Sequence, residues 1–206
     1  SYHACMVGRT YIEQLGGIPA EVDNASEFRY RKPIIDDKTL IVAVGQSGES
    51  VDTLAAMDLA RKRGALLVTV CNTPGSQATR MADGTVFMRC GPEIAVASTK
   101  TLVGSIVALY LLGARIGEAR GFLDEDALAQ AIADIFQAPQ ILGEALKTED
   151  EAKAVAEEFY AFEHFLFLGR GLQYAIAMEG ALKLKEVSYI HAEGFAAGEL
   201  KHGPIA

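Results

Sequence analysis

The sequence predicts an α/β fold built on a parallel β-sheet. Three mainly apolar runs, at 39–44, 65–71 and 84–90, are typical of strands buried on both faces of such a sheet. A segment with helical spacing of apolar residues, 51–63, separates the first two runs, and a long apolar helix is expected at 99–116. Strands that alternate with helices in this way favour a parallel sheet with right-handed crossovers.

Shorter elements precede the first of these strands. The pattern predicts a helix at 2–15 that stops at Gly16-Gly17, then a short strand at 20–23 and a helical turn at 26–30. The turns that follow the three strands, at 45–50, 72–76 and 91–98, all lie at the carboxyl edge of the expected sheet. Ligands of open α/β sheets bind at that edge.

The second part of the chain is helical before it returns to the α/β pattern. Residues 124–162 read as an amphipathic connector of two or three helices, with Pro139 marking a break or a new helix start. An apolar strand at 165–168, followed by Gly169-Arg170-Gly171, begins a second strand–turn–helix unit. We therefore expect three parts: a first α/β domain at 1–122, a helical connector at 123–163, and the start of a second α/β domain at 164–206.

Composition excludes several classes of function. The net charge is −8, and the only basic cluster is Arg29-Tyr30-Arg31-Lys32, so nucleic acid is not expected as a partner. The longest apolar stretch, Leu102 to Ile116, is short for a bilayer and contains Arg115, so we expect no membrane segment. Because the chain begins at Ser1 and stops without a helical cap, we expect a piece of a longer protein.

The cysteines and histidines predict neither a redox centre nor a metal site. The three cysteines, Cys5, Cys71 and Cys90, are widely spaced among apolar residues, which favours reduced core thiols in a cytoplasmic protein over a redox role. Cys and the four histidines show no metal-ligand spacing. The residues therefore call for no metal and no cofactor.

The turn Gly45-Gln46-Ser47-Gly48-Glu49-Ser50 is the first candidate site. It joins the end of a buried strand to the start of a helix, where free backbone N–H groups and the helix dipole favour an anion such as phosphate. Plain helix capping by Ser47 or Ser50 explains the same residues. The turn alone leaves both interpretations open.

A charged face on the helix after Gly171 is the second candidate. Glu179, Lys183 and Glu186 stand at i, i+4 and i+7, which places them on one face. A solvated face with a Glu–Lys pair is one interpretation. With His202 following in a turn, the other is a carboxylate base and proton donors suited to aldose–ketose proton transfer.

Four segments, 26–31, 46–50, 93–100 and 179–204, closely resemble the isomerizing glutamine–fructose-6-phosphate aminotransferases, the glucosamine-6-phosphate synthase family. The match covers nearly the whole chain and corresponds to the isomerase half, which is built from two sugar isomerase (SIS) domains. It implies a three-layer αβα sandwich with a parallel sheet, a helical connector and the start of a second SIS domain. It also implies an activity that converts fructose 6-phosphate and ammonia from a separate glutaminase domain into glucosamine 6-phosphate.

The resemblance also implies roles for residues of the first domain. Gln46, Ser47 and Ser50, with Gly48 in their turn, would hold the phosphate, helped by Ser1. The 96–98 segment would contact the sugar hydroxyls. Its residues are Val96, acting through its backbone, Ala97 and Ser98.

In the second domain, the resemblance makes Glu186 the base that moves a proton between C1 and C2, with Lys183 assisting. His202 would promote ring opening and would reach the site of the neighbouring subunit, so a homodimer is expected. No cofactor or metal is implied.

Some family features differ or are absent. Gly45 stands where the family usually has Ser, and Ser50 where Thr is usual. The glutaminase domain, most of the second SIS domain and the tail with its lysine are missing, which makes activity of this chain alone doubtful. Two alternatives stay open: another SIS phosphosugar isomerase or deglycase, and a phosphosugar-sensing module without a catalytic base.

Overall fold

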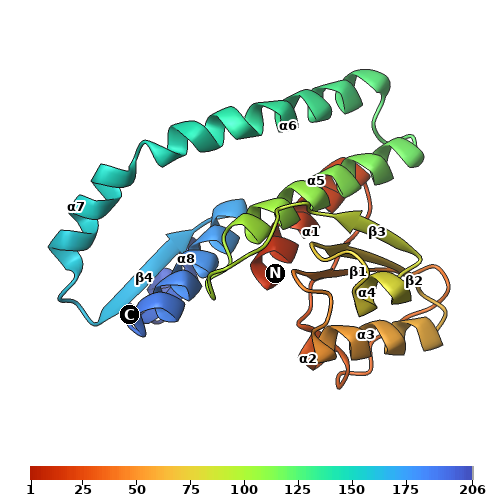
Figure 1. The fold of residues 1–206 in the computed structure, drawn as a ribbon, viewed down its shortest axis with the longest axis horizontal. Helices are drawn as coiled ribbons and strands as arrows, with labels where there is room; N and C mark the ends of the chain where they lie inside the picture. The colour runs from red at the N-terminus through yellow and green to blue at the C-terminus, as the bar shows by residue number, and fades with distance from the viewer. Residues whose placement is uncertain (206) are drawn as a thin grey trace. The chain divides into compact units, whose positions relative to one another are not determined.

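The computed structural model describes residues 1–205, which fall into two compact units, Ser1–Ile116 and Gly117–Ala206 (Figure 1). Each unit combines helices with a parallel sheet, which confirms the predicted α/β class. The first unit contains α1 (Tyr2–Gly16), α2 (Ala25–Phe28), β1 (Leu40–Gly45), α3 (Val51–Lys62), β2 (Leu66–Cys71), α4 (Gln77–Met81), β3 (Gly84–Phe87) and most of α5 (Lys100–Ala119). The second contains α6 (Glu125–Leu146), α7 (Glu149–Phe159), β4 (His164–Gly169), α8 (Leu172–Ser188), β5 (His191–Ala196) and the 3₁₀ helix η1 (Ala197–His202).

The sheet of the first unit has the order β1-β2-β3, with all strands parallel. Gly45 pairs with Cys71, and Cys71 pairs with Phe87, so the carboxyl ends of the three strands are in register. The turns after β1 and β2 and the loop after β3 therefore leave the sheet at one edge. The two candidate segments of this unit, 46–50 and 96–98, both follow strands that end there.

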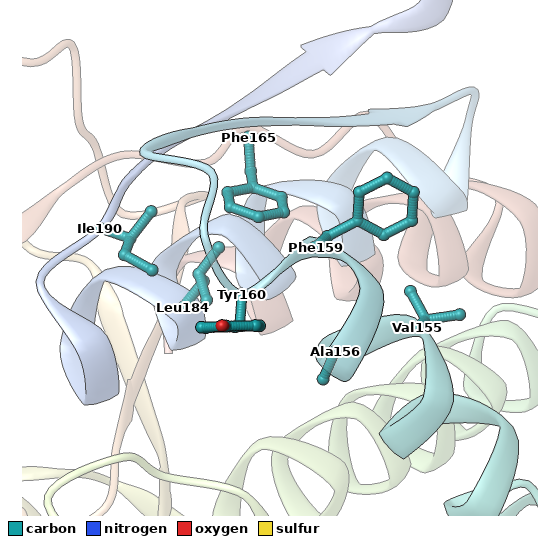
Figure 2. Close-up of a pocket in the computed structure, with 7 residues that line it drawn as sticks. All are labelled: Val155, Ala156, Phe159, Tyr160, Phe165, Leu184 and Ile190. Atoms are coloured by element: carbon teal, nitrogen blue, oxygen red, sulfur yellow. The ribbon is translucent and has the colours of Figure 1, made fainter.

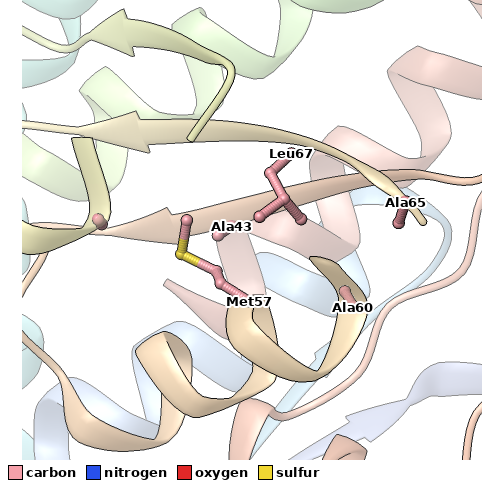
Figure 3. Close-up of a cluster of buried hydrophobic side chains, with 6 residues drawn as sticks. Ala43, Met57, Ala60, Ala65 and Leu67 are labelled. Carbon is pink, nitrogen blue, oxygen red and sulfur yellow. The ribbon is translucent and has the colours of Figure 1, made fainter. Parts of the chain in front are cut away.

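Helices cover both faces of this sheet, which makes the first unit a three-layer sandwich. Alternate residues of a strand point to opposite faces. On one face Ala43 and Leu67 form a cluster with Met57 of α3 (Figure 3). On the other face Val70 packs against Ala108 and Leu109 of α5.

Helix α5 is long and apolar enough to cross a membrane by length and composition alone. It is longer than the predicted helix at 99–116 because it continues to Ala119. Its Ala108 and Leu109 are almost fully buried against the sheet. Such packing is typical of the core helix of an α/β domain.

The second unit contains a two-stranded parallel sheet. Strands β4 and β5 pair over their full length and are joined by α8. Phe167 points toward α8, where it contacts Gly180, whereas Leu166 and Leu168 are each 48% exposed on the other face. The alternation follows from the period of two residues in a strand.

Two expectations from the sequence were wrong, and two elements were missed. Residues 20–23 form no strand, since they have no place in the sheet order, and Glu21 and Asp23 pair instead with Arg31. Pro139 lies inside α6 and does not break it, although a proline removes one backbone hydrogen bond from the helix. The first helix of the connector ends at Leu146 instead, and the connector consists of two helices, which agrees with the expected two or three. Strand β5 and helix α4 were not predicted.

Candidate functional site

The β1–α3 turn, residues 46–50, depends on a glycine at its centre. Gly48 has a φ of 68°, which an L side chain rarely adopts. A Cβ at this position would clash with Ser76 Oγ and would lie 2.8 Å from Cys71 Sγ. Both the backbone conformation and the space therefore require glycine.

Backbone hydrogen bonds tie this turn to the loop after β2. Asn72 N donates to Gln46 O at 3.0 Å, and Ala78 N donates to Gly48 O at 2.9 Å. Gln77 N donates to Glu49 Oε1 at 2.8 Å, so the Glu49 carboxylate caps α4. The conformation of the turn is thus fixed by groups on both sides of it.

The serine hydroxyls of the turn bear on the choice between capping and anion binding. Ser50 is the N-cap residue of α3 but makes no side-chain cap hydrogen bond, and it is exposed. Ser47 Oγ accepts from Glu49 N at 3.2 Å and leaves its own proton available. Since neither hydroxyl satisfies the N–H groups of α3 itself, the geometry favours the anion interpretation.

Charge near the turn is partly neutralised by Arg29. Its guanidinium donates to Asp52 Oδ1 at 2.7 Å, in the first turn of α3. That hydrogen bond raises the pKa of Arg29. The Asp52 carboxylate would otherwise repel an anion at the helix start.

The loop before α5 is anchored by Glu93. Its Oε2 accepts from Thr101 Oγ1 at 2.7 Å and from Thr101 N at 3.0 Å, and its Oε1 lies 3.5 Å from Thr99 N and Oγ1. The hydrogen bonds with Thr101 lower the pKa of Glu93 to about 2. The carboxylate therefore holds the start of α5, as an acidic group does at a helix N-terminus.

The other end of this loop is held by Asn72. Its side chain accepts from Cys90 N at 2.9 Å and donates to Gly91 O at 2.7 Å. The 96–98 segment lies between these anchors and α5. Val96 is 94% exposed, and Ser98 Oγ hydrogen-bonds with Thr101 Oγ1.

In the second unit, α8 brings Glu179, Lys183 and Glu186 together as its periodicity predicts. Lys183 Nζ lies 3.3 Å from Glu179 Oε1 and 2.5 Å from Glu186 Oε2. Glu179 is buried, with 7% of its side chain exposed, and the other two side chains are about one quarter exposed, at 24% and 28%. The solvated-face interpretation is therefore excluded for Glu179.

The two carboxylates favour the charged form of Lys183. Burial alone would lower the pKa of Lys183, but hydrogen bonds with Glu186 and Glu179 outweigh it, and the pKa is raised. Glu186 Oε2 is a buried atom that forms an ion pair with this ammonium. A carboxylate with an unused lone pair beside a permanent ammonium can accept a proton and return it.

The remaining predicted residues stand at the ends of elements. His202 is the last residue of η1, directly after β5, and it is exposed. Ser1 is the N-cap residue of α1, makes no side-chain cap hydrogen bond, and is also exposed. The structure thus groups Gln46, Ser47, Gly48 and Ser50 in one turn of the first unit, and Lys183 with Glu186 on one helix of the second.

A family model for the SIS domain matches residues 1–115 and 158–206. The chain belongs to the SIS domain family. It is 51% identical over 207 residues to a glutamine–fructose-6-phosphate aminotransferase (isomerizing) of Pseudomonas syringae pv. tomato and 48% identical over 206 residues to that of Clostridium tetani. All of this chain is covered in both cases, but it spans only 34% of the length of each relative.

A solved SIS structure has nearly the same fold. The C-terminal domain of glucosamine-fructose-6-phosphate aminotransferase from Francisella tularensis superposes with a TM-score of 0.97 at 40% sequence identity. The match covers 100% of this chain and 58% of that chain. The predicted SIS fold is therefore confirmed.

Two residues of this SIS chain that lie beside the candidate segments, Glu93 and Cys71, were not predicted as part of a site. Glu93 lies in the 93–100 segment, and the hydroxyls of Thr99 and Thr101 at the start of the predicted helix were a signal that its carboxylate could bind them. Cys71 lies under the β1–α3 turn, with its Sγ 3.4 Å from Ser76 Oγ. All three cysteines are free, and burial raises the pKa of Cys5 to about 11, which fits reduced thiols.

An apolar pocket of about 260 Å³ lies in the second unit (Figure 2). Its walls come from α7, β4 and α8 and the residues that adjoin them: Val155, Ala156, Phe159, Tyr160, Phe165, Leu184 and Ile190. Only the Tyr160 hydroxyl is polar among these side chains. The pocket therefore lacks the donors that a sugar phosphate requires.

Proposed function

We propose that this chain is the isomerase part of an enzyme that makes glucosamine 6-phosphate from fructose 6-phosphate and ammonia. The observation that carries the proposal is the α8 cluster, in which the Lys183 ammonium stands between two carboxylates. Identity of 51% over the whole chain to an isomerizing aminotransferase supports the same reaction. A sensing module would need the β1–α3 turn but no proton-transfer group.

The first unit would bind the substrate. The phosphate would receive hydrogen bonds from the side chains of Gln46, Ser47 and Ser50 and from the N–H groups at the start of α3, with Gly48 allowing close approach. Ser1 would add a hydroxyl. The segment of Val96, Ala97 and Ser98 would contact the sugar hydroxyls.

The second unit would carry out the proton transfers. His202 would open the sugar ring, and ammonia would add to the C2 carbonyl with loss of water to give an imine. Glu186 would then take a proton from C1 while the imine nitrogen gains one, which gives an enolamine. Return of the proton to C2, with loss of the C1 hydroxyl proton, would leave an amine at C2 and an aldehyde at C1. Lys183 would stabilise negative charge that develops beside the base.

The proposal includes partners and a location. Ammonia would come from a glutaminase domain elsewhere in the protein, and a homodimer would let His202 serve the neighbouring site. We place the enzyme in the cytoplasm. Another SIS phosphosugar isomerase or deglycase is the alternative function, because it would use the same turn and base without glutamine.

The test uses the full-length protein that contains this chain, supplied with glutamine and fructose 6-phosphate. Glu186→Gln should abolish glucosamine 6-phosphate formation and leave fructose 6-phosphate affinity, measured by calorimetry, nearly unchanged. Glu157→Gln, at an exposed position on α7, is the matched control and should retain activity. Undiminished turnover in Glu186→Gln would contradict the assignment of the base, and isomerisation that never incorporates ammonia would favour the alternative.

A further inference from the structure

Two histidines that lie 27 residues apart in the sequence meet on the second sheet. His164 and His191 are the first residues of β4 and β5, and they are directly paired in the parallel register. Paired residues of neighbouring strands point to the same face, about 4.8 Å apart along the hydrogen-bonding direction. The backbone itself therefore fixes both imidazoles side by side at the amino ends of the strands.

The two rings direct the same type of nitrogen at each other. The Nδ1 atoms are 3.2 Å apart, and the ring centroids are 5.3 Å apart with an angle of 72° between the ring planes. Two nitrogen ligands about 2.0–2.1 Å from one metal ion lie about 2.9 Å apart at a right angle and about 3.4 Å apart at a tetrahedral angle. The observed separation falls within this interval.

Glu193 selects the form of His191 that can bind a metal. Its Oε1 lies 3.2 Å from His191 Nε2, so the carboxylate accepts the Nε2 proton and leaves a lone pair on Nδ1. A carboxylate on the far nitrogen is the usual outer partner of a metal-bound histidine. Both histidines are exposed, so water can occupy the other coordination positions.

We propose that His164 and His191 form a binding site for one divalent late transition-metal ion, of the nickel, copper or zinc class, through their Nδ1 atoms. Imidazole nitrogen suits these ions, whereas Mg²⁺ and Ca²⁺ prefer oxygen ligands. In residues 1–205 no group of three His, Cys, Asp or Glu side chains is placed to hold a metal, so water supplies the remaining ligands.

Binding would replace one strand-to-strand contact by a stronger one. Without metal, one Nδ1 donates its proton to the other across 3.2 Å. The ion takes the place of that shared proton, which moves to the other nitrogen of the same ring or to water. Because one ligand comes from β4 and the other from β5, the ion would bridge the two strands and stabilise their pairing.

Calorimetric titration of the full-length protein with NiCl₂, in a buffer that does not chelate metals, tests the site. His164→Gln and His191→Gln each remove one proposed ligand. Each substitution should abolish the single nickel-binding event or lower its affinity by more than about tenfold, which is the smallest loss expected when only an outer partner is removed. The control His3→Gln, on α1, should bind as the unchanged protein does. Nickel affinity within about tenfold of that of the unchanged protein, in either histidine variant, would overturn the proposal.

Two further measurements keep the proposal testable if a histidine variant folds poorly. Glu193→Gln should weaken nickel binding by about tenfold or more while both ligands remain. In the unchanged protein, less than one equivalent of Cu²⁺ should give an electron paramagnetic resonance spectrum with two coordinated imidazoles, and MgCl₂ should compete with neither ion. A copper spectrum with a single imidazole, or with none, would contradict the site.

Discussion

The β1–α3 turn and the charged face of α8 hold their functional groups by different means. In the turn, backbone hydrogen bonds from Asn72 and Ala78 and the conformation of Gly48 fix the arrangement. On α8, ion pairs of Lys183 with Glu179 and Glu186 fix it. Binding should therefore be sensitive to backbone conformation, and proton transfer to side-chain charge.

Removal of the ammonium from α8 should give the largest effect. Lys183→Met in the full-length enzyme removes the ion-pair partner of both carboxylates, and we expect glucosamine 6-phosphate turnover to fall about 10²- to 10⁴-fold, the usual contribution of a proton-transfer group. Affinity for fructose 6-phosphate should change little. The control is Lys185→Met, at an exposed position on the same helix. Equal losses in the two variants, with folding checked by circular dichroism, would contradict a specific role for Lys183.

A change of backbone should damage the turn instead. Gly48→Ala introduces strain of roughly 1–3 kcal/mol and a clash with Ser76 and Cys71, so we expect fructose 6-phosphate affinity to drop about tenfold or more. Gly75→Ala is a matched control, because Gly75 has a similar φ of 73° but open space around its Cβ position. Calorimetry should find normal affinity in that control. The same loss in both variants would mean that strain alone, and not the packing under the turn, matters.

A gain of affinity is expected at Gly45. Nothing lies within 4 Å of a Cβ built there, so Gly45→Ser should fit and add a hydroxyl at the start of the turn. One more hydrogen bond to phosphate should strengthen fructose 6-phosphate binding by about 0.5–1.5 kcal/mol, or roughly two- to tenfold. Gly45→Ala fills the same space without a donor and should show no gain. A gain in both would indicate an effect of chain stiffness instead.

The smallest expected effect concerns the pH dependence of stability through Glu93. Its pKa is lowered from 4.5 to about 2, so its contribution is present above about pH 4.5 and is lost as the pH falls toward 2. Glu93→Gln should therefore unfold more easily than the unchanged protein at pH 6, and the difference should narrow between about pH 4.5 and 2. Denaturant titrations across that range measure it. A difference that stays constant with pH would assign the loss to geometry and not to charge.

The sequence was sufficient where a feature depends on neighbours in the chain. Helical spacing alone placed Lys183 and Glu186 together, and the apolar runs predicted the three strands of the first sheet. The β1–α3 turn was located in the same way, between a strand and a helix. In each case the pattern that predicts the feature involves residues within about seven positions of one another in the sequence.

Features that depend on distant partners were missed or misjudged. Strand β5 contains Gly194 and polar residues, so its sequence does not resemble a buried strand. It forms because its backbone pairs with that of β4. Residues 20–23 have strand-like composition but no partner strand. The meeting of His164 and His191 likewise depends on register, so a search for metal-ligand spacing could not find it.

Helix α4 has only five residues, too few to be stable on its own. Its first N–H groups are bonded to the Glu49 carboxylate and the Gly48 carbonyl, which belong to the β1–α3 turn. Helix α4 and the β1–α3 turn should therefore unfold together, as one cooperative unit. A phosphate bound at the turn should therefore slow amide hydrogen exchange in residues 77–81 as well.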